Sequence, residues 1–447
     1  MATDLSALRA QLDSENVDVV RLVFADILGI TRSKDLLVSQ LEKTKSPAFC
    51  QGVWVTTTQG GVLDGHEIMS TGLPDLITEL DPSTVTMLPW EPGVAFVIAD
   101  ALNPDGTASE LSPRGILRRV IEQYTELGLT PVVGPELEFY IANVTEEGWE
   151  RAIHRTGRVY TTGAWVDPDG TFLHLLRMLD QMDIGVFAGN HEFSPSQYEI
   201  NLWHSEAMDA ADRSFLFKTA VKDIVAREGK LATFLGKPWT DEGGSGFHLH
   251  LSVVDADGNN LMHGDDGELS PLAHELIAGI VHNAAALSAV TNPTVNAYKR
   301  LGPDTLAPYR ANWGHDNRSA MLRVPPERGA GTRLEIRLGD GAANPYLLTA
   351  AILAAGLDGI RHNRMAPAPC VGWAYEDAAA AVLPTTLEEA LDALGGNDAM
   401  RAILGAPIVD VFMMLKRDEV ERYRAATTDH TTRDVTRWEL DEYISDY

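Results

Sequence analysis

The sequence predicts an α+β fold in which a small strand-rich domain, residues 1–108, precedes a larger α/β domain, residues 109–447. Short apolar runs separated by turn signals fill the first hundred residues. Beyond them, alternating apolar and polar segments are separated by long apolar stretches that are typical of helices. The length of 447 residues allows two or three domains, so this division is compatible with the size of the chain.

The boundary near residue 108 follows from a change of pattern. Val17–Phe24 and Val94–Ala99 are mostly apolar and predict strands, and the turn signal Asn103–Gly106 closes the second. Ser112-Pro113 then predicts the start of a helix, because serine caps helices and proline suits their first turn. Apolar residues at helical spacing continue from there to Gly128, where we expect the helix to end.

Four segments of the larger domain alternate apolar side chains with acidic, histidine or arginine side chains. Successive residues of a strand point to opposite faces, so each segment predicts a strand with one apolar and one polar face. We expect apolar helices at Phe215–Glu228, Leu272–Val290 and Tyr346–Ile360 to cover the apolar faces and leave the polar faces over a cavity. The four segments are Pro135–Tyr140, Gln197–Leu202, Phe247–Ser252 and Arg333–Leu338.

Composition excludes several classes of protein. The chain has 64 acidic against 36 basic residues and a net charge of −28, which argues against binding to nucleic acid or to an anionic membrane surface. Cys50 and Cys370 are the two cysteines, so no disulfide framework is expected. The N-terminal segment lacks the apolar core of a signal peptide, and no run of about 18 apolar residues occurs. We therefore expect a soluble, cytoplasmic protein.

The polar faces are the strongest functional signal. An alternating strand is most often half solvated, but such a face usually carries lysine, threonine and serine. Here carboxylates occur at positions i and i+2 without adjacent lysine, and clustered carboxylates persist where a cation binds them. Oxygen ligands with one imidazole favour Mg²⁺ or Mn²⁺ over zinc, and nearby arginines suit phosphate or carboxylate groups. Together these features indicate phosphoryl transfer from a nucleotide, without any P-loop or dinucleotide-binding glycine motif.

Several long motifs in this region resemble those of the glutamine synthetase family, in the same order. The resemblance extends from the Val19–Arg32 segment to Trp438-Glu439, nearly the whole chain. The motifs that resemble the family signatures are Gly134–Phe139, Asn190–Glu199, Lys237-Pro238 with Gly244–His250, Asn296–Leu301, Asn317–Ser319 and Asn344–Leu347.

The resemblance implies a β-grasp-like N-terminal domain and a glutamine synthetase-type α/β catalytic domain with an antiparallel sheet lining the active site. It also implies a homo-oligomeric double ring, commonly a dodecamer, in which the N-terminal domain of one subunit closes the site of the next. The implied substrates are glutamate, an amine and ATP. The implied cofactors are two or more Mg²⁺ or Mn²⁺ ions per site.

By motif position, the resemblance also assigns roles to residues. Glu192, Arg318 and Arg337 are the implied catalytic residues. One metal ion would be held by Glu138, Glu192 and Glu199, and a second by Glu136, His248 and Glu335. Glutamate binding is assigned to Gly244, Arg300 and Arg337, and ATP binding to His250, Ser252, Arg318, Arg323 and Arg333. A plain structural ion pair is the alternative for Arg323 and for Lys299.

The half of the family pattern that handles ammonia is altered. The family's Asp-Gly-Ser-Ser motif is absent, and Phe49–Trp54 stands in the corresponding region. Leu306 occupies the position of a flap glutamate that takes a proton from the nucleophile, and Asn190 replaces the first of two histidines. Ammonium is a cation at neutral pH and needs anionic ligands and a base before it can attack, so these losses weaken the case for ammonia.

The leading hypothesis is therefore an ATP-dependent glutamate–amine ligase that makes γ-glutamylamides, in amine assimilation or catabolism, by way of γ-glutamyl phosphate. An organic amine with an alkyl or aryl part suits this pocket better than a polyamine. The alternative is a true glutamine synthetase that uses other groups as base, with Asp304 a candidate. A non-catalytic structural or regulatory ring is ranked lowest, because all six metal-ligand candidates are present. The residues assigned to the amine pocket are Trp54, Tyr160, Asp304 and Leu306.

Overall fold

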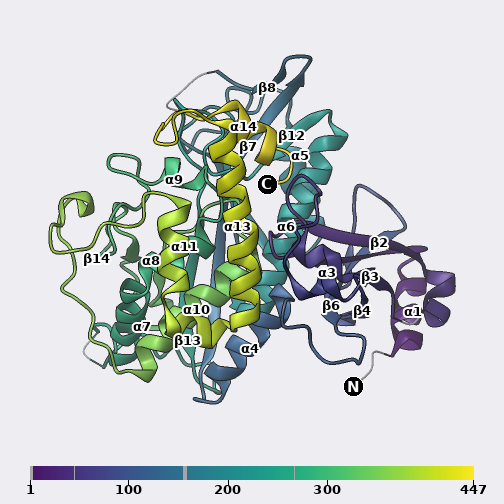
Figure 1. Cartoon of the computed structure of the whole chain (residues 1–447), viewed down its shortest axis with the longest axis horizontal. Helices are drawn as coiled ribbons and strands as arrows, with labels where there is room; N and C mark the ends of the chain where they lie inside the picture. The colour runs from purple at the N-terminus through teal and green to yellow at the C-terminus, as the bar shows by residue number, and fades with distance from the viewer. Residues whose placement is uncertain (1–3, 45, 155–158, 266) are drawn as a thin grey trace.

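The computed structural model describes residues 4–44, 46–154, 159–265 and 267–447, and it contains two β-sheets (Figure 1). The first sheet has the strand order β2-β1-β6-β4-β3, with β5 added beside β6, and β1 runs parallel to β6. Its strands are β1 (Val19–Ala25), β2 (Thr31–Leu37), β3 (Ala48–Cys50), β4 (Asp75–Leu80), β5 (Thr86–Met87) and β6 (Val94–Leu102). The two N-terminal strands expected from the sequence are confirmed as β1 and β6. The domain boundary near residue 108 stays a prediction.

The second sheet has the order β14-β15-β16-β13-β7-β10-β9, and β8, β11 and β12 also pair with the long strand β7. All its pairs are antiparallel except β14 with β15. Its strands are β7 (Thr130–Thr145), β8 (Gly148–Arg151), β9 (Val186–His191), β10 (Gln197–Leu202), β11 (Ser205–Glu206), β12 (Lys230–Thr233), β13 (Phe247–Val254), β14 (Trp313–His315), β15 (Leu322–Val324) and β16 (Leu334–Ile336). The four expected strands are thus neighbours in one sheet.

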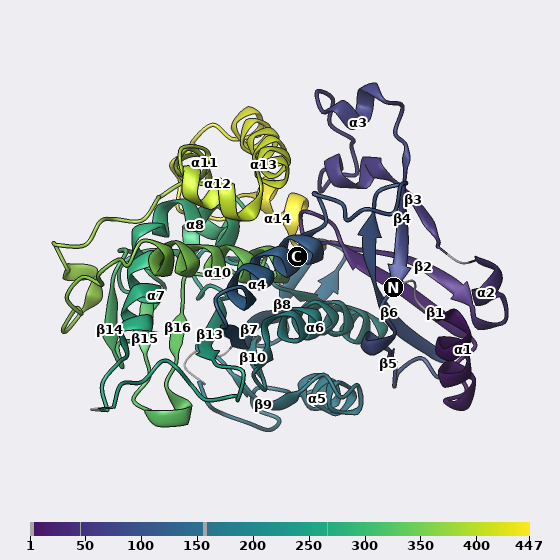
Figure 2. The ribbon, with the colours of Figure 1, turned by 90° about the horizontal axis from the view of Figure 1, so that it is seen from below.

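Helices form two layers over the apolar face of this sheet. Figure 2 shows α4, α7 and α10 between the sheet and the outer helices α11, α12 and α13, and α10 contacts α4, α6, α7 and α12. The helices are α1 (Leu5–Ser14), α2 (Leu41–Thr44), α3 (Glu67–Ser70), α4 (Pro113–Thr125), α5 (Thr171–Gln181), α6 (Ala207–Arg227), α7 (Pro271–His282), α8 (Ala284–Thr291), α9 (Ala297–Arg300), α10 (Pro345–Arg361), α11 (Leu387–Gly395), α12 (Asp398–Leu404), α13 (Ala406–Ala426) and α14 (Arg437–Tyr443).

The helix expected over Leu272–Val290 is in fact two helices, which is a correction. The chain breaks at Asn283, which is 1% exposed. The Asn283 amide donates hydrogen bonds of 2.9 Å to the Gly279 carbonyl and to Asp358 in α10. An asparagine side chain that bonds the backbone competes with helix continuation, so α7 ends and α8 starts here. The helix from Ser112-Pro113 is confirmed, with the Ser112 side chain accepting from the Gly115 amide.

The register of the central strands determines which functional side chains meet. Glu199 of β10 is paired with Glu138 of β7, His248 of β13 with Glu136, and His250 with Glu335 of β16. The side chains on the other face of these strands, among them Leu137, are buried against the helices. The sheet therefore has one apolar face in the core and one face that gathers carboxylates and imidazoles, as the alternation predicts.

A buried arginine ties the two sheets together. Arg114 of α4 is 6% exposed, and its guanidinium donates to Asp212 of α6 at 2.8 and 2.9 Å. It also donates to Asp81, directly after β4, at 2.7 Å and to Asp100 of β6 at 2.9 Å. The position of the first sheet relative to the helices of the second thus depends on one cation shared by three carboxylates.

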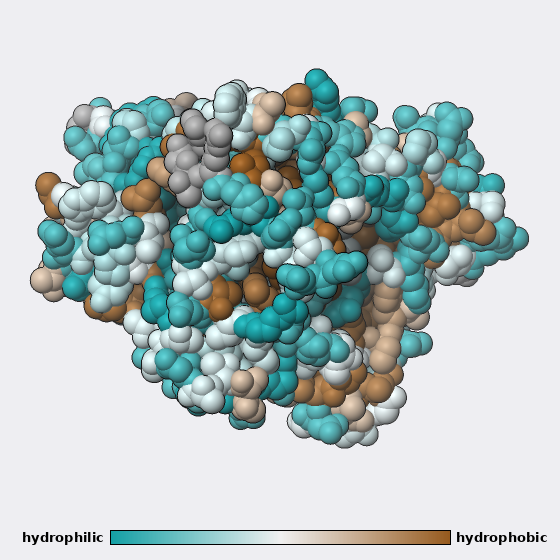
Figure 3. Space-filling view, turned by 90° about the horizontal axis from the view of Figure 1, so that it is seen from above, coloured by the Kyte–Doolittle hydropathy of each residue, from teal (hydrophilic) through white to brown (hydrophobic). Residues whose placement is uncertain are grey.

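The surface agrees with the acidic composition. On the face that Figure 3 shows, hydrophobic residues occur in small groups among hydrophilic ones. Within the residues that the structure describes, no helix combines the length and the apolar character needed to cross a bilayer.

Arg114→Leu is expected to lower the free energy of unfolding by about 3–5 kcal/mol, because it leaves the buried Asp212 carboxylate without its cation. Arg118→Leu is the matched control: Arg118 also lies on α4 and pairs with Asp100 at 2.8 Å, but it is 39% exposed. Loss of that pair is expected to cost about 0–1 kcal/mol. Denaturant unfolding of both variants measures the difference, and equal losses would contradict the role assigned to Arg114.

Candidate active site

Five glutamates and two histidines lie together on the polar face of the large sheet. Glu136 and Glu138 come from β7, Glu199 from β10, and His248 and His250 from β13; Glu335 of β16 and Glu192, just after β9, complete the group. The ligand atoms of two subsets lie within 4.8 Å of one another, and Glu136 belongs to both. The subsets are Glu136, Glu199 and His248, and Glu136, His250 and Glu335.

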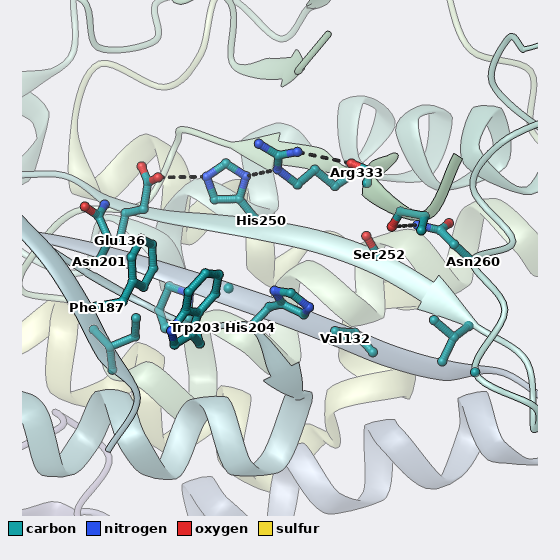
Figure 4. A pocket seen from close by; sticks show the side chains of 17 residues that line it. Val132, Glu136, Phe187, Asn201, Trp203, His204, His250, Ser252, Asn260 and Arg333 are labelled. Atoms are coloured by element: carbon teal, nitrogen blue, oxygen red, sulfur yellow. Dashed lines mark hydrogen bonds and ion pairs between the residues drawn. The ribbon is translucent and has the colours of Figure 1, made fainter. Parts of the chain in front are cut away.

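These subsets differ from the two ligand sets that the family resemblance implies. Glu136 and Glu335 are grouped here with His250 and not with His248, and Glu199 is grouped with Glu136 and His248. Arg333 Nε donates to His250 Nδ1 at 3.1 Å, and His250 Nε2 lies 3.0 Å from Glu136 Oε1 (Figure 4). Because Nδ1 accepts a hydrogen bond from the Arg333 Nε–H group, Nε2 carries the ring proton and donates to Glu136. In this arrangement His250 orients Glu136. The distribution of ligands between ions stays a prediction.

The carboxylates repel one another strongly. Burial, and then the charge of Glu138, raise the pKa of Glu192 to about 7. Burial, together with the charges of Glu136 and Glu138, raises the pKa of Glu199 well above its usual value. Such crowding of like charges is stable when a cation neutralises it. The donor set of carboxylate oxygens and imidazoles therefore fits divalent metal ions.

The carboxylates on the other side of the cluster are held as anions. Burial opposes the ionisation of Glu335, but the positive charge of Arg337 outweighs it and lowers the pKa to about 2. Arg337 Nη1 donates to Glu335 at 2.5 Å, and Arg323 also donates to this carboxylate. For Glu136, burial is likewise outweighed, here by hydrogen bonds from the two histidines, and the pKa lies well below its usual value.

Two buried arginines border the cluster. Arg337 Nε is buried and has no hydrogen-bond partner among the described residues, which leaves a donor for an anionic ligand. Arg300 donates to the Leu338 and Gly339 carbonyls at 2.7 and 2.9 Å, and its Nε lies 3.4 Å from Asp340. Gly244 packs so closely on Arg300 that a Cβ there would lie 2.2 Å from Arg300 Cγ. Gly244 and Arg300 are thus brought together, as expected.

Of two cavities in this region, the first borders the cluster and the second contains none of its residues. The first, of about 610 Å³, reaches Glu136 and His250 and contains Ser252 and Arg333, two of the residues assigned to ATP. The rings of Phe187 and Trp203 stack at its border with centroids 4.2 Å apart. The second, of about 620 Å³, contains Leu306 and Arg318. The ATP-assigned residues are therefore divided: Arg318 lies at the second cavity, and Arg323 lies between Asp316 and Glu335.

The four residues assigned to the amine pocket do not lie together. Leu306 is 37% exposed at the second cavity, and its carbonyl accepts from Arg337 at 3.3 Å. Asp304 is on the same loop, and both have positive φ angles, 63° and 57°. Tyr160 is exposed beside β9, where its amide donates to the His191 carbonyl. Trp54 is 1% exposed and packs on Phe24, so within this chain it fills the core of the N-terminal sheet.

Several amide side chains in the site received no role in the sequence analysis. Asn190 donates to Glu192 at 3.0 Å, Asn201 to Glu199 at 3.1 Å, and Gln197 to Glu138 at 3.3 Å. These donors orient the carboxylates, as partners of metal ligands usually do. The signal for two of them was present, because Gln197 and Asn201 alternate with Glu199 on the polar face of β10. Asp340 is also buried, but it lies beyond the end of β16 and outside the alternating segment, so the alternation gives no signal for it.

Comparison with known proteins gives consistent results. Residues 110–442 match the family "Glutamine synthetase, catalytic domain". The chain is 36% identical over 441 residues to a glutamine synthetase of Pyrococcus horikoshii, covering 96% of each chain. It is 35% identical over 453 residues to that of Thermus thermophilus, covering 98% of each. The solved structure "GmaS/ADP complex-Conformation 1" is 30% identical, with a TM-score of 0.84 over 97% of this chain and 98% of that one.

Addition of Mn²⁺ is expected to stabilise the protein, by about 2.7 kcal/mol at a hundredfold excess over the dissociation constant. In Glu199→Gln most of this gain should disappear, while the metal-free variant should be at least as stable as the metal-free wild type, because like-charge repulsion is relieved. Thermal unfolding with and without Mn²⁺ measures both effects. Glu150→Gln, an exposed change on β8 of the same sheet, is the control. An undiminished gain in Glu199→Gln would show that Glu199 is not a ligand.

Metal affinity is also expected to depend on pH. The pKa of Glu192 is raised to about 7, so its carboxylate is charged above this pH and protonated below it. Cation binding should be strongest above pH 7 and weaken as the pH falls, by about tenfold per unit for each proton displaced. Calorimetric titration with Mn²⁺ at pH 8, 7 and 6 checks this, and Glu192→Gln should show a smaller dependence. Equal affinity at pH 8 and pH 6 would contradict the electrostatic description of the cluster.

Proposed function

The chain belongs to the glutamine synthetase family of ATP-dependent ligases, and from this premise we propose that it joins the γ-carboxyl group of glutamate to a primary amine other than ammonia. Two features support the proposal. The carboxylate and imidazole groups suited to metal binding lie together, with Arg323 and Arg337 on Glu335. The acids that would bind and deprotonate ammonium are absent from the corresponding positions.

The proposed roles of the residues follow the arrangement of the site. Glu136, Glu138, Glu192, Glu199, His248 and Glu335 would hold divalent metal ions, Mg²⁺ or Mn²⁺, which neutralise the phosphate oxygens when bound. The first cavity would take the nucleotide, with His250, Ser252 and Arg333 on it. Arg318 and Arg323 would reach the transferred phosphate. Arg300 and Arg337, with Gly244 beside them, would hold glutamate, since buried guanidinium groups favour carboxylates.

The reaction would then proceed in two steps. An oxygen of the glutamate γ-carboxylate attacks the γ-phosphorus of ATP, the bond to the β,γ-bridging oxygen breaks, and ADP leaves. Arginine side chains at the border of the site stabilise the charge that spreads over the phosphoryl oxygens. The amine nitrogen then attacks the carbonyl carbon of γ-glutamyl phosphate, the carbon–oxygen bond to phosphate breaks, and inorganic phosphate leaves. The acceptor attacks as the neutral amine, so an alkylammonium ion first loses a proton to water. The amine nitrogen loses a second proton as the amide forms, for which Asp304 on the Leu306 loop is the proposed acceptor.

The observation on which the amine assignment depends is Leu306. Its side chain lines the second cavity, and its carbonyl is hydrogen-bonded to Arg337, which contacts Glu335 of the cluster. A leucine can neither bind ammonium nor take its proton, but it can contact the hydrocarbon part of an organic amine. This position therefore favours an amine that brings an apolar substituent to the site.

A second candidate, a true glutamine synthetase, is favoured by one specific observation. The curated relatives at 35–36% identity over nearly the full length are named glutamine synthetase, and the structures named GmaS are 30% identical. In that case ammonium would be the best acceptor and another group would replace the flap glutamate. The two functions share the first step and differ in the second.

Glutamine synthetases are oligomeric, and we propose a homo-oligomeric double ring, with twelve subunits, for this chain as well. In such a ring the N-terminal sheet of one subunit would border the site of its neighbour. Light scattering of the purified protein gives the number of subunits.

Phosphate release from ATP with glutamate, Mg²⁺ and each of a panel of amines tests the proposal. The wild type should use an organic amine with a kcat/KM at least about tenfold above that for ammonium, because general-base help for ammonium is worth tenfold or more. Leu306→Glu should shift the ratio toward ammonium by a similar factor. Leu306→Met is the control, since it keeps an apolar side chain of similar volume. Ammonium as the best acceptor of the wild type would establish the second candidate.

A further inference from the structure

The second cavity has an apolar wall that the two-step reaction does not use. It lies where the Leu306 loop meets the loop after β14 and the segment 369–373. Leu306, Pro369, Val371 and Trp373 supply its apolar side chains. Val371 is 95% exposed and Trp373 is 60% exposed. Exposed apolar side chains that share one cavity indicate a binding surface.

This wall has a fixed backbone. The Cys370 amide donates to the Trp313 carbonyl of β14 at 2.8 Å, and Asn317 Nδ2 donates to the Gly372 carbonyl at 2.8 Å. The Ala374 amide donates to Ser319 Oγ at 2.9 Å. The Trp373 ring also stacks on Tyr375, with centroids 6.0 Å apart and planes 12° apart. The backbone of this wall and the Trp373 ring are therefore held in place before any ligand arrives, which lowers the entropy cost of binding.

The cavity is connected to the reacting centre through Leu306. The Leu306 side chain faces the cavity, and its carbonyl is bonded to Arg337, which in turn donates to Glu335 of the cluster. The first cavity borders the cluster at different residues, Glu136 and His250. A nucleotide in the first cavity would leave the second free for a different substrate, whose path to the cluster runs past Leu306 and Arg337.

The charges of the cavity restrict what that substrate can be. Asp316 is the one carboxylate among its lining residues, and both Nε and Nη2 of Arg323 donate to its Oδ1, at 3.0 and 2.6 Å. Arg318 adds an exposed positive charge. A second ammonium group on a substrate would therefore meet the Arg318 cation, and the one carboxylate on this wall is already paired with Arg323. A neutral hydrocarbon substituent meets neither penalty.

We propose that this cavity binds the hydrocarbon substituent of the acceptor amine, and that Trp373 and Val371 select a primary monoamine with an alkyl or aryl group over ammonium and over diamines. The inference rests on the proposed amine ligation and adds its substrate class and two specificity-determining residues. The amino end of the acceptor points past Leu306 toward the cluster, and the apolar end lies along Trp373.

A series of n-alkylamines from methylamine to n-hexylamine, with 1,4-diaminobutane, tests the inference in the full-length enzyme. In the wild type kcat/KM should rise about two- to fourfold per methylene group until the cavity is filled. n-Butylamine should exceed 1,4-diaminobutane at least tenfold. Trp373→Ala should remove most of this rise through the KM for the amine, with the KM values for glutamate and ATP unchanged.

Two further variants make the result specific. Met365→Ala is the matched control, since Met365 is 86% exposed and close in sequence to the segment 369–373 but does not line the cavity. The kcat/KM values of this variant across the amine series should match those of the wild type. Val371→Asp adds a carboxylate at a fully solvated position, so the fold should tolerate it. It should reduce use of n-butylamine and raise use of 1,4-diaminobutane.

The outcomes separate this inference from the proposed function. Ammonium as the best wild-type acceptor would overturn both. If the wild type uses alkylamines efficiently and Trp373→Ala and Val371→Asp show the same dependence on chain length as the wild type, the inference alone is overturned. The substituent would then bind elsewhere. A smaller assembly for Trp373→Ala in light scattering, with unchanged amine preference, would identify Trp373 as a subunit contact and likewise overturn the inference.

Discussion

Repulsion among buried carboxylates is the constraint on which the rest of this site depends. The register of β7, β10, β13 and β16 brings acidic side chains into contact, and burial makes their charges costly. Part of the cluster is neutralised within the chain, because Arg323 and Arg337 bind Glu335. The remainder, around Glu192 and Glu199, carries raised pKa values that only protons or cations can relieve. This asymmetry suits a site that takes metal ions together with an anionic substrate.

The same arrangement separates the two halves of the proposed reaction. Most of the metal-ligand candidates lie on strands of one sheet, whose pairing leaves little freedom of position. The groups proposed to face the acceptor lie on loops, at Leu306 and in the segment 369–373, where a side chain can change without disturbing the sheet. In the proposed function, the acceptor could therefore be changed by loop substitutions while the groups that activate glutamate are retained.

Alternation with a period of two predicted correctly that Glu136, Glu138, Glu199, His248 and His250 share one face, because strand geometry alone decides this. The resemblance added the order of the domains and the family, and the comparisons confirm the family. Features that depend on distant contacts could not be predicted. The break at Asn283 requires Asp358 of another helix, and the buried position of Trp54 requires Phe24. The wall formed by Trp373 faces Leu306 only after folding, since the two are far apart in the sequence.

The central claim is that activated glutamate passes to an organic amine. A competition experiment tests it most directly: the enzyme is given ATP, glutamate and equal concentrations of ammonium and n-butylamine, and the products are quantified by mass spectrometry. The account predicts γ-glutamylbutylamide as the main product, and one ADP and one phosphate should form for each amide bond made. Glutamine as the main product would contradict the claim and assign the chain to ammonia-dependent synthesis.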